Sequence, residues 1–419
     1  MGLMVGWGRA RVALGLLGLA VGVPLSACTA PGGGVPPVVP SGPPDSAALA
    51  TRLTQVVARG DRAGFDALFV PAGTPAADAP GGVVPATGDR RDLLWTNLHA
   101  VGVIQFFAGP QPGQLRVSWT VAADDPQPPA WQVIRGVTCD THGCGLLDLA
   151  AQPGTPAPLW AVQPVTVTRA GEVSVLAHGD GVPWIDAAVA GLAAVEAADL
   201  AGLTGGAPGE LVVEVPASFA AFEAVLGTGT ADATGALTWT ADSGLPPDAA
   251  TPTAPTTPGG WFAPKAAVRV VVNPTATAPL SATEKTMLLA HEAVHVVTAG
   301  HPAAPGRTWV AEGVAEQVAL TLDAGTRDWS RQAARRQCGQ AGLEPPPDAA
   351  FHGEDAAAVR DAYAVSWQLV TLLWQHEPSA TAEAARLALW DGNAASDVLA
   401  NLAAWSAAWC QDTTADGEG

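Results

Sequence analysis

Two hydrophobic periodicities divide the first part of the chain into a helix and several strands. Apolar residues recur on one face of residues 47–57, which is typical of an amphipathic helix. Apolar and polar residues then alternate with a period of two over residues 115–121 and 165–168, as in half-buried strands. A helix followed by such strands predicts an α+β domain with an antiparallel sheet over residues 46–178.

The pattern changes after residue 178, where strands and helices are expected to alternate before a run of helices. The expected strands are residues 210–215, 236–240 and 268–272, and the expected helices are residues 184–200, 218–226, 282–299, 309–322 and 354–375. A small sheet followed by a helical half predicts a second α+β domain over residues 179–411. The acidic residues 412–419 are expected to form a disordered tail.

The first 45 residues are expected to precede both domains. Arg9 and Arg11 stand before an apolar run over residues 12–25, which is the composition of an export signal and is shorter than a membrane span requires. Residues 28–45 are rich in Pro and Gly and cannot bury a core, so they predict a tether.

One short motif, His291-Glu292-Ala293-Val294-His295, carries metal chemistry. The segment is expected to be helical because Ser281 and Glu284 form a capping box and no Pro or Gly follows before Gly300. Histidines four residues apart lie on one face of a helix and can bind a zinc ion, while Glu292 can act as a general base. The alternative is a solvated helix face, but the chain has only eight histidines, which makes a chance match less frequent.

The motif and its downstream sequence resemble the gluzincin metallopeptidases, the thermolysin-like clan, and within it the small bacterial peptidase MA-like domains. The resemblance rests on His291-Glu292-x-x-His295 followed by Trp309-Val310-Ala311-Glu312-Gly313-Val314-Ala315-Glu316. It implies a zinc metallopeptidase in which His291, His295 and Glu312 bind Zn²⁺, Glu292 is the catalytic base and Glu316 supports a ligand histidine. The sheet, the HExxH helix and the helical C-terminal half come in the order of that family.

The resemblance also assigns roles outside the zinc helices. Tyr363, the only tyrosine, lies in Tyr363-Ala364-Val365-Ser366, similar to a stretch of these domains, which implies that its hydroxyl stabilises the oxyanion. The alternative is an aromatic residue that packs between helices, and His352 is a second candidate for the role. The strand over residues 269–273 is implied to be a sheet edge that pairs with extended substrate; an interior strand is the alternative.

A second zinc pattern competes for the third ligand. Metzincins read HExxHxxGxxH, and His301 occupies the position of their third histidine. Their turn glycine would be residue 298, where this chain has Thr298, and no methionine follows Met287 to form their Met-turn. Glu312 is therefore the expected third ligand.

The five cysteines indicate export. Leu25-Ser26-Ala27-Cys28 resembles a bacterial lipobox, which implies cleavage before Cys28 and an extracytoplasmic protein anchored to the cell membrane by lipid; an ordinary secretory signal is the alternative. The remaining four are expected to form disulfides in an oxidising compartment. Cys139 and Cys144 bracket a short loop, and Cys338 and Cys410 then pair by elimination. A zinc site built on Cys139, His142 and Cys144 is a rival interpretation.

The formal charge of −19 excludes one class of partner. No basic cluster is present to bind a phosphate backbone, so nucleic acid is not expected. A peptide or protein substrate is the expected partner, and the lipid at Cys28 is the expected contact with the membrane. The alternative to a peptidase is a surface lipoprotein that uses this fold for binding or envelope assembly without catalysis.

Overall fold

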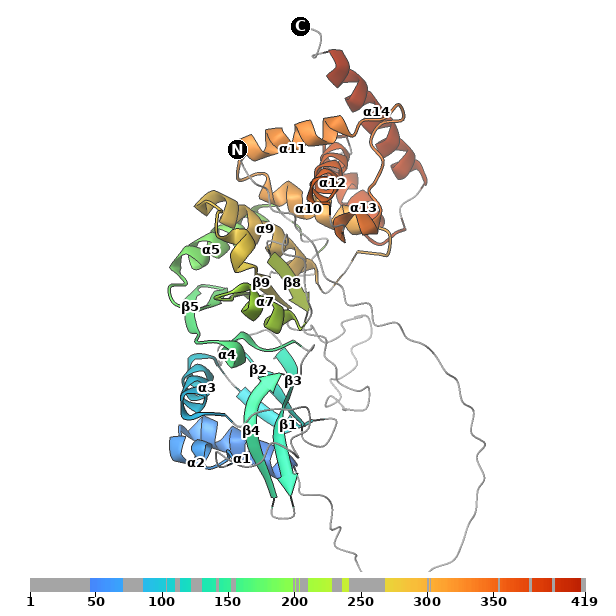
Figure 1. Ribbon diagram of the computed structural model, residues 1–419. Coiled ribbons are helices and arrows are strands. Elements are labelled where there is room, and N and C mark those ends of the chain that lie inside the picture. The colour runs from blue at the N-terminus through green and yellow to red at the C-terminus, as the bar shows by residue number, and fades with distance from the viewer. Residues whose placement is uncertain are drawn as a thin grey trace, which may run out of the picture.

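The computed structural model describes residues 46–70, 86–102, 104–109, 114–121, 130–140, 143–151, 156–198, 200, 203, 210–227, 236–240, 268–299, 301, 303–352, 355–376, 379–393 and 396–415. The expected export signal, lipobox and tether, residues 1–45, lie outside them. Figure 1 shows an N-terminal sheet with its helices at one end, a second sheet in the middle and a group of helices at the other end. The α+β class, with helices last, is as the sequence predicts.

The N-terminal part packs helices on an antiparallel sheet. Its helices are α1 (Ser46–Arg59), α2 (Arg62–Asp66) and α3 (Gly88–Ala100), and its strands are β1 (Ile104–Ala108), β2 (Gln114–Trp119), β3 (Ala130–Asp140) and β4 (Gly143–Ala151). The strands follow one another as an antiparallel meander in the order β1-β2-β3-β4. Leu53, Leu94, Leu115 and Leu146, from both layers, are fully buried and form a shared core.

The middle sheet is mixed and has the order β5-β6-β7-β9-β8. Its strands are β5 (Thr166–Ala170), β6 (Val173–Ala177), β7 (Leu211–Val215), β8 (Ala236–Thr240) and β9 (Val268–Val272). β6, β7 and β9 are parallel, whereas β5 and β8 close the two edges in antiparallel pairing. The connecting helices are α4 (Leu159–Val162), α5 (Val182–Ala197), α7 (Phe219–Leu226) and α8 (Pro274–Thr277).

β5 and β6 come before the expected boundary between residues 178 and 179, and β6 pairs with β7, which comes after it. This sheet corrects one expectation. The expected edge strand over residues 269–273 is interior: β9 lies between β7 and β8, and β8 is the edge. All five residues of β9 are buried, as in a strand covered on both faces.

Both faces of the middle sheet are covered. Leu176, Val212 and Val271 point into the core shared with the N-terminal part. On the same face Arg269 Nη1 lies 3.1 Å from Glu214 Oε1, and its guanidinium stacks 3.6 Å from the ring centroid of Trp119 in β2. The opposite face, with Val270, packs against the helices that follow. The N-terminal part and the sheet therefore share one buried interface, with an ion pair and a cation–π contact inside it.

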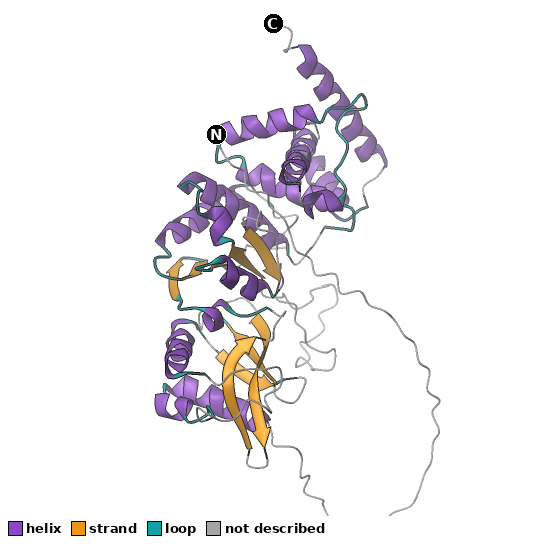
Figure 2. Ribbon diagram, in the orientation of Figure 1, coloured by secondary structure: helices purple, strands orange, loops and turns teal. Residues whose placement is uncertain are grey.

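The last part is helical (Figure 2). Its elements are α9 (Ala282–Thr298), α10 (Thr308–Ala319), α11 (Ala324–Arg336), the 3₁₀ helix η2 (Asp348–His352), α12 (Ala356–His376), α13 (Ser379–Trp390) and α14 (Ser396–Ala415). Residues 412–415, expected in a disordered tail, belong to α14, since no helix-breaking residue occurs before Gly417. Among the described helices, none has the length and hydropathy of a membrane span.

Two disulfides are present as predicted, Cys139–Cys144 across β3 and β4 and Cys338–Cys410 between the end of α11 and α14. The first removes the thiolates that a zinc site at Cys139, His142 and Cys144 would need. Both indicate an oxidising, extracytoplasmic compartment.

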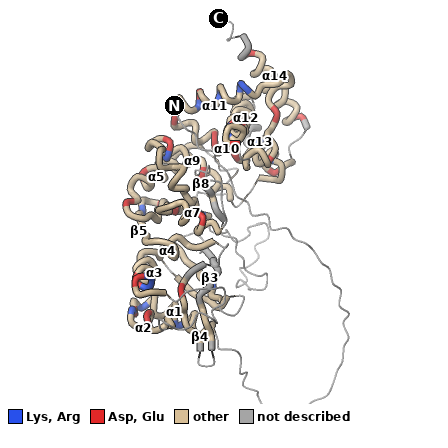
Figure 3. The backbone as a smooth tube through the Cα atoms, viewed as in Figure 1, with Lys and Arg blue, Asp and Glu red and all other residues tan. Residues whose placement is uncertain are grey.

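Positive charge in the helical part is concentrated on α11. α11 carries four arginines, drawn in blue in Figure 3, within a chain of net charge −19. Two of them pair with carboxylates, since Arg331 Nη1 lies 2.7 Å from Asp328 and Arg336 Nη2 lies 3.9 Å from Asp361. These exposed pairs contribute little to stability.

Candidate metal centre

α9 brings the two motif histidines into the protein interior. The predicted capping box is present: Ser281 Oγ accepts from Glu284 N at 3.3 Å, and Glu284 Oε2 accepts from Ser281 N at 2.8 Å. α9 then runs close along α5, because a Cβ at Gly191 would lie only 2.8 Å from Ala290 N. His291 and His295 are therefore buried, with 1% and 2% of their surface exposed. A solvated helix face is ruled out.

α10 supplies the third residue of the site. Glu312 is 1% exposed and faces both histidines. The next residue, Gly313, allows α10 to approach α12, since a Cβ there would lie 2.5 Å from Ser366 O. Glu312 therefore sits on a helix held tightly between α9 and α12.

The three side chains meet at one point. Glu312 Oε2 lies 3.1 Å from His291 Nε2 and 3.1 Å from His295 Nε2, and the two nitrogens are themselves 3.1 Å apart. Among the described residues these three form the one group of His, Cys, Asp or Glu whose donor atoms are arranged to hold a metal ion. Ligands of a tetrahedral zinc ion at its usual bond lengths lie about 3.3–3.4 Å from one another. The donor set and its geometry fit zinc.

The electrostatics of the site also favour a cation. Burial acts to lower the pKa of His291, but hydrogen bonds and charges from Glu312 and Glu316 outweigh it and raise that pKa to about 10. Two buried carboxylates around one imidazole thus draw positive charge into the site. A divalent metal would take the place of the proton that His291 otherwise holds.

Glu316 lies behind His291, one helical turn after Glu312. Its Oε1 is 3.3 Å from His291 Nδ1, the ring nitrogen that faces away from Glu312. A carboxylate in this position orients the imidazole and makes its other nitrogen a better donor to a metal. The resemblance predicted this placement.

Glu292 is buried, with 4% of its surface exposed, and receives a hydrogen bond that the sequence did not suggest. Thr238 Oγ1 in edge strand β8 donates to Glu292 Oε2 at 2.5 Å and also approaches the backbone oxygen of Glu292 at 3.3 Å. The period-two pattern predicts β8 as a strand, but nothing local to Thr238 indicates that it lies beside α9.

Tyr363 lies next to His291 of the candidate metal centre. Its ring centroid is 5.9 Å from that of His291 and 5.3 Å from that of Phe351, both in edge-on contacts. The side chain is 6% exposed. Tyr363 thus packs against a neighbouring ring and also lies close to the candidate metal centre. His352, the second candidate, is exposed at the end of η2.

His301, the rival third ligand, belongs to a different contact. Its Nε2 lies 2.7 Å from Asp391 Oδ1, and its side chain is 42% exposed. Its backbone oxygen accepts from Trp390 Nε1 at 2.7 Å. His301 fastens the segment after α9 to the end of α13 and is not part of the buried group.

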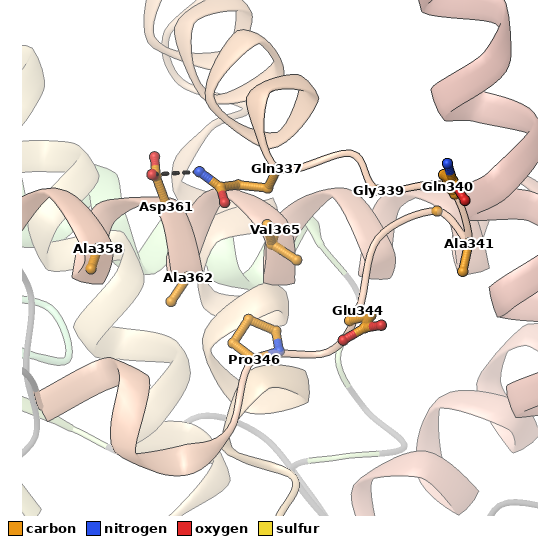
Figure 4. A pocket seen from close by; sticks show the side chains of 11 residues that line it. Gln337, Gly339, Gln340, Ala341, Glu344, Pro346, Ala358, Asp361, Ala362 and Val365 are labelled. Carbon is orange, nitrogen blue, oxygen red and sulfur yellow. Dashed lines mark hydrogen bonds between the residues drawn. The ribbon is translucent and has the colours of Figure 1, made fainter.

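A separate pocket of about 580 Å³ lies between α12 and residues 337–346 (Figure 4). Glu344, Asp361 and Gln337 give it a polar lining, and Gln337 Nε2 donates to Asp361 Oδ2 at 2.6 Å. None of the three buried donors of the metal centre lines it.

A search against models of known protein families finds no match to this chain, and a search of curated proteins finds no similar sequence. The buried His291, His295 and Glu312 are consistent with a gluzincin site.

Proposed function

We propose that the protein is an extracytoplasmic zinc metallopeptidase of the gluzincin type. The observation that carries the proposal is the triangle of buried donor atoms from His291, His295 and Glu312, each 3.1 Å from the other two. A protein that only binds a partner has no need for a buried carboxylate at Glu292 beside this group.

Each residue around the triangle of donor atoms has a separate role in peptide hydrolysis. A zinc ion in this site would polarise the scissile carbonyl and lower the pKa of a bound water. Glu292 accepts a proton from the attacking water and passes it to the leaving amine, while Thr238 holds its carboxylate in one direction. Glu316 keeps the His291 ring in place. The hydroxyl of Tyr363 donates a hydrogen bond to the oxyanion.

The substrate is proposed to be an extended peptide that pairs with β8. This strand is an edge of the middle sheet, and its Thr238 contacts Glu292. A peptide added to a sheet edge is held by main-chain hydrogen bonds, which would present its backbone to the metal centre.

The protein is further proposed to be held at the outer face of the cell membrane of a bacterium by lipid on Cys28. The support is the lipobox-like sequence before Cys28 and the two disulfides, which indicate an oxidising compartment.

The test compares metal content and peptidase activity on an unfolded protein substrate in the wild type and in Glu292→Gln. The wild type should hold about one zinc per chain, and Glu292→Gln should keep the zinc and lose nearly all activity. Glu284→Gln, in the capping box of the same helix, is the control and should keep both. Zinc without activity in the wild type would favour the binding lipoprotein, and a wild type without zinc would reject the metal centre.

A further inference from the structure

The N-cap residue of α10, the helix that carries Glu312, does not cap the helix with its side chain. Arg307, the residue before α10, makes no side-chain cap hydrogen bond. By contrast, Ser281 caps α9 and Asp323 caps α11 from their own N-cap positions. The first backbone N–H groups of a helix need partners from outside it.

Asp348, from a distant part of the chain, accepts from the first N–H group of α10 and from a second N–H group in the turn just before the helix. Its Oδ1 accepts from Thr308 N at 3.2 Å, and its Oδ2 accepts from Gly306 N at 3.0 Å. A carboxylate at this end of a helix also interacts favourably with the helix dipole. Glu312 follows the first turn of α10 directly, so a frayed first turn would release the backbone that holds this ligand.

Asp348 is itself held in place by a segment that we call the brace, residues 337–352. At its start Cys338 is bonded to Cys410 in α14, and Gln337 donates to Asp361 in α12 (Figure 4). In its middle, Leu343 N donates to Ser406 Oγ at 3.3 Å. Near its end Phe351 packs against the ring of Tyr363. The brace thus contacts α10, which carries Glu312, and also Tyr363, whose ring lies against His291 of α9.

We propose that Asp348 is a positioning residue of the metal centre, which acts by capping α10 and so fixes Glu312 relative to His291 and His295. The inference rests on the proposed metal centre. It predicts that loss of the cap weakens metal binding and changes the coordination geometry, beyond any general loss of stability.

The experiment uses the full chain loaded with Co²⁺, whose visible spectrum reports ligand number and geometry. The variants are Asp348→Ala, which removes both acceptors, Asp348→Asn, which keeps one, and Asp323→Ala as the matched control. Asp323 caps α11 through Thr326 N at 2.7 Å, and none of the three metal ligands lies on that helix. Thermal unfolding gives the stability of each variant, and competition with a chelator gives its metal affinity.

Asp348→Ala is expected to bind Co²⁺ about five-fold more weakly and to show an altered spectrum, since a lost cap corresponds to about that factor in an equilibrium constant. Asp323→Ala should lose similar stability with wild-type affinity and spectrum, and Asp348→Asn should lie closer to the wild type. Equal metal affinity and spectra in Asp348→Ala and Asp323→Ala would overturn the inference. If Asp348→Ala does not fold, an unchanged affinity and spectrum in Asp348→Asn would overturn it equally. A wild type that binds no Co²⁺ would instead reject the metal centre.

Discussion

The hydroxyl of Thr238 donates to the carboxylate of Glu292, and this contact joins the edge of the middle sheet to the HExxH helix. Glu292 is therefore held from two sides, by its own helix and by the strand proposed to receive substrate.

The Thr238 contact predicts that Thr238→Val lowers kcat by about ten-fold while zinc content stays the same, because a hydrogen bond to a charged group contributes about 1.5–3 kcal/mol. Peptidase kinetics and metal analysis on the same preparation measure both quantities. Thr286→Val, at a half-buried position of α9 where the hydroxyl donates to Ala282 O of the same helix, is the control and should leave both unchanged. Full activity in Thr238→Val would show that the contact does not orient Glu292.

The ligand triangle predicts which histidines bind the metal. His291→Ala, His295→Ala or Glu312→Ala should each lose most of the bound zinc, since three protein ligands leave none to spare. His301→Ala should keep the zinc, because His301 pairs with Asp391 at 2.7 Å. Metal analysis after gel filtration is the measurement. Loss of zinc from His301→Ala with retention in Glu312→Ala would reverse the assignment.

The close approach of α10 and α12 predicts that Gly313→Ala is harmful. The added methyl group would lie 2.5 Å from Ser366 O, so the helices must separate, at a cost of about 1–3 kcal/mol, and Glu312 must move with them. Gly325→Ala in α11 meets only Asp323 Oδ2 at 3.5 Å and should be neutral or slightly stabilising. Denaturant unfolding and zinc affinity should separate the two variants, and equal behaviour would contradict the packing argument.

The Cys338–Cys410 disulfide, with a sequence separation of 72 residues, should contribute about 2–4 kcal/mol to the free energy of unfolding. The Cys338→Ser, Cys410→Ser double variant tests this by denaturant unfolding. The corresponding variant of Cys139 and Cys144, separated by 5 residues, should lose less, because the closed loop is much shorter. The reverse order would contradict the loop-length argument.

The lipobox-like sequence predicts that Cys28→Ser abolishes lipid labelling and releases the protein from membranes. Membrane fractionation and mass spectrometry of the N-terminal peptide measure this. Membrane retention without an acyl group on wild-type Cys28 would contradict it.

What the sequence predicted well depends on short-range geometry. The spacing of His291 and His295 within one helix, the capping box at Ser281 and the alternation in β8 all follow from the period of a helix or strand. The position of Glu312 opposite the histidines was predicted only through the resemblance to a known motif. Its distance along the chain does not by itself determine which helices pack together.

What the sequence did not predict depends on pairing between distant segments. β9 was expected at an edge, yet β8 adds outside it, and period-two alternation carries no information about which strands become neighbours. The contact of Thr238 with Glu292 spans 54 residues, and the cap that Asp348 provides for Thr308 spans 40. Such contacts exist only once the sheet and helices have packed.

β5 and β6 lie before residue 178 in the sequence, but both belong to the middle sheet. The chain therefore cannot be cut near residue 178 into two separately folded parts. A fragment that starts at residue 179 would leave β7 with an unpaired edge and uncover Val212 and Val271, which pack into the core shared with the N-terminal part. Such a fragment should aggregate when produced alone. The N-terminal part therefore cannot be replaced by another domain. Recombination or truncation near residue 178 would remove strands of the sheet against which α9 and α10 pack.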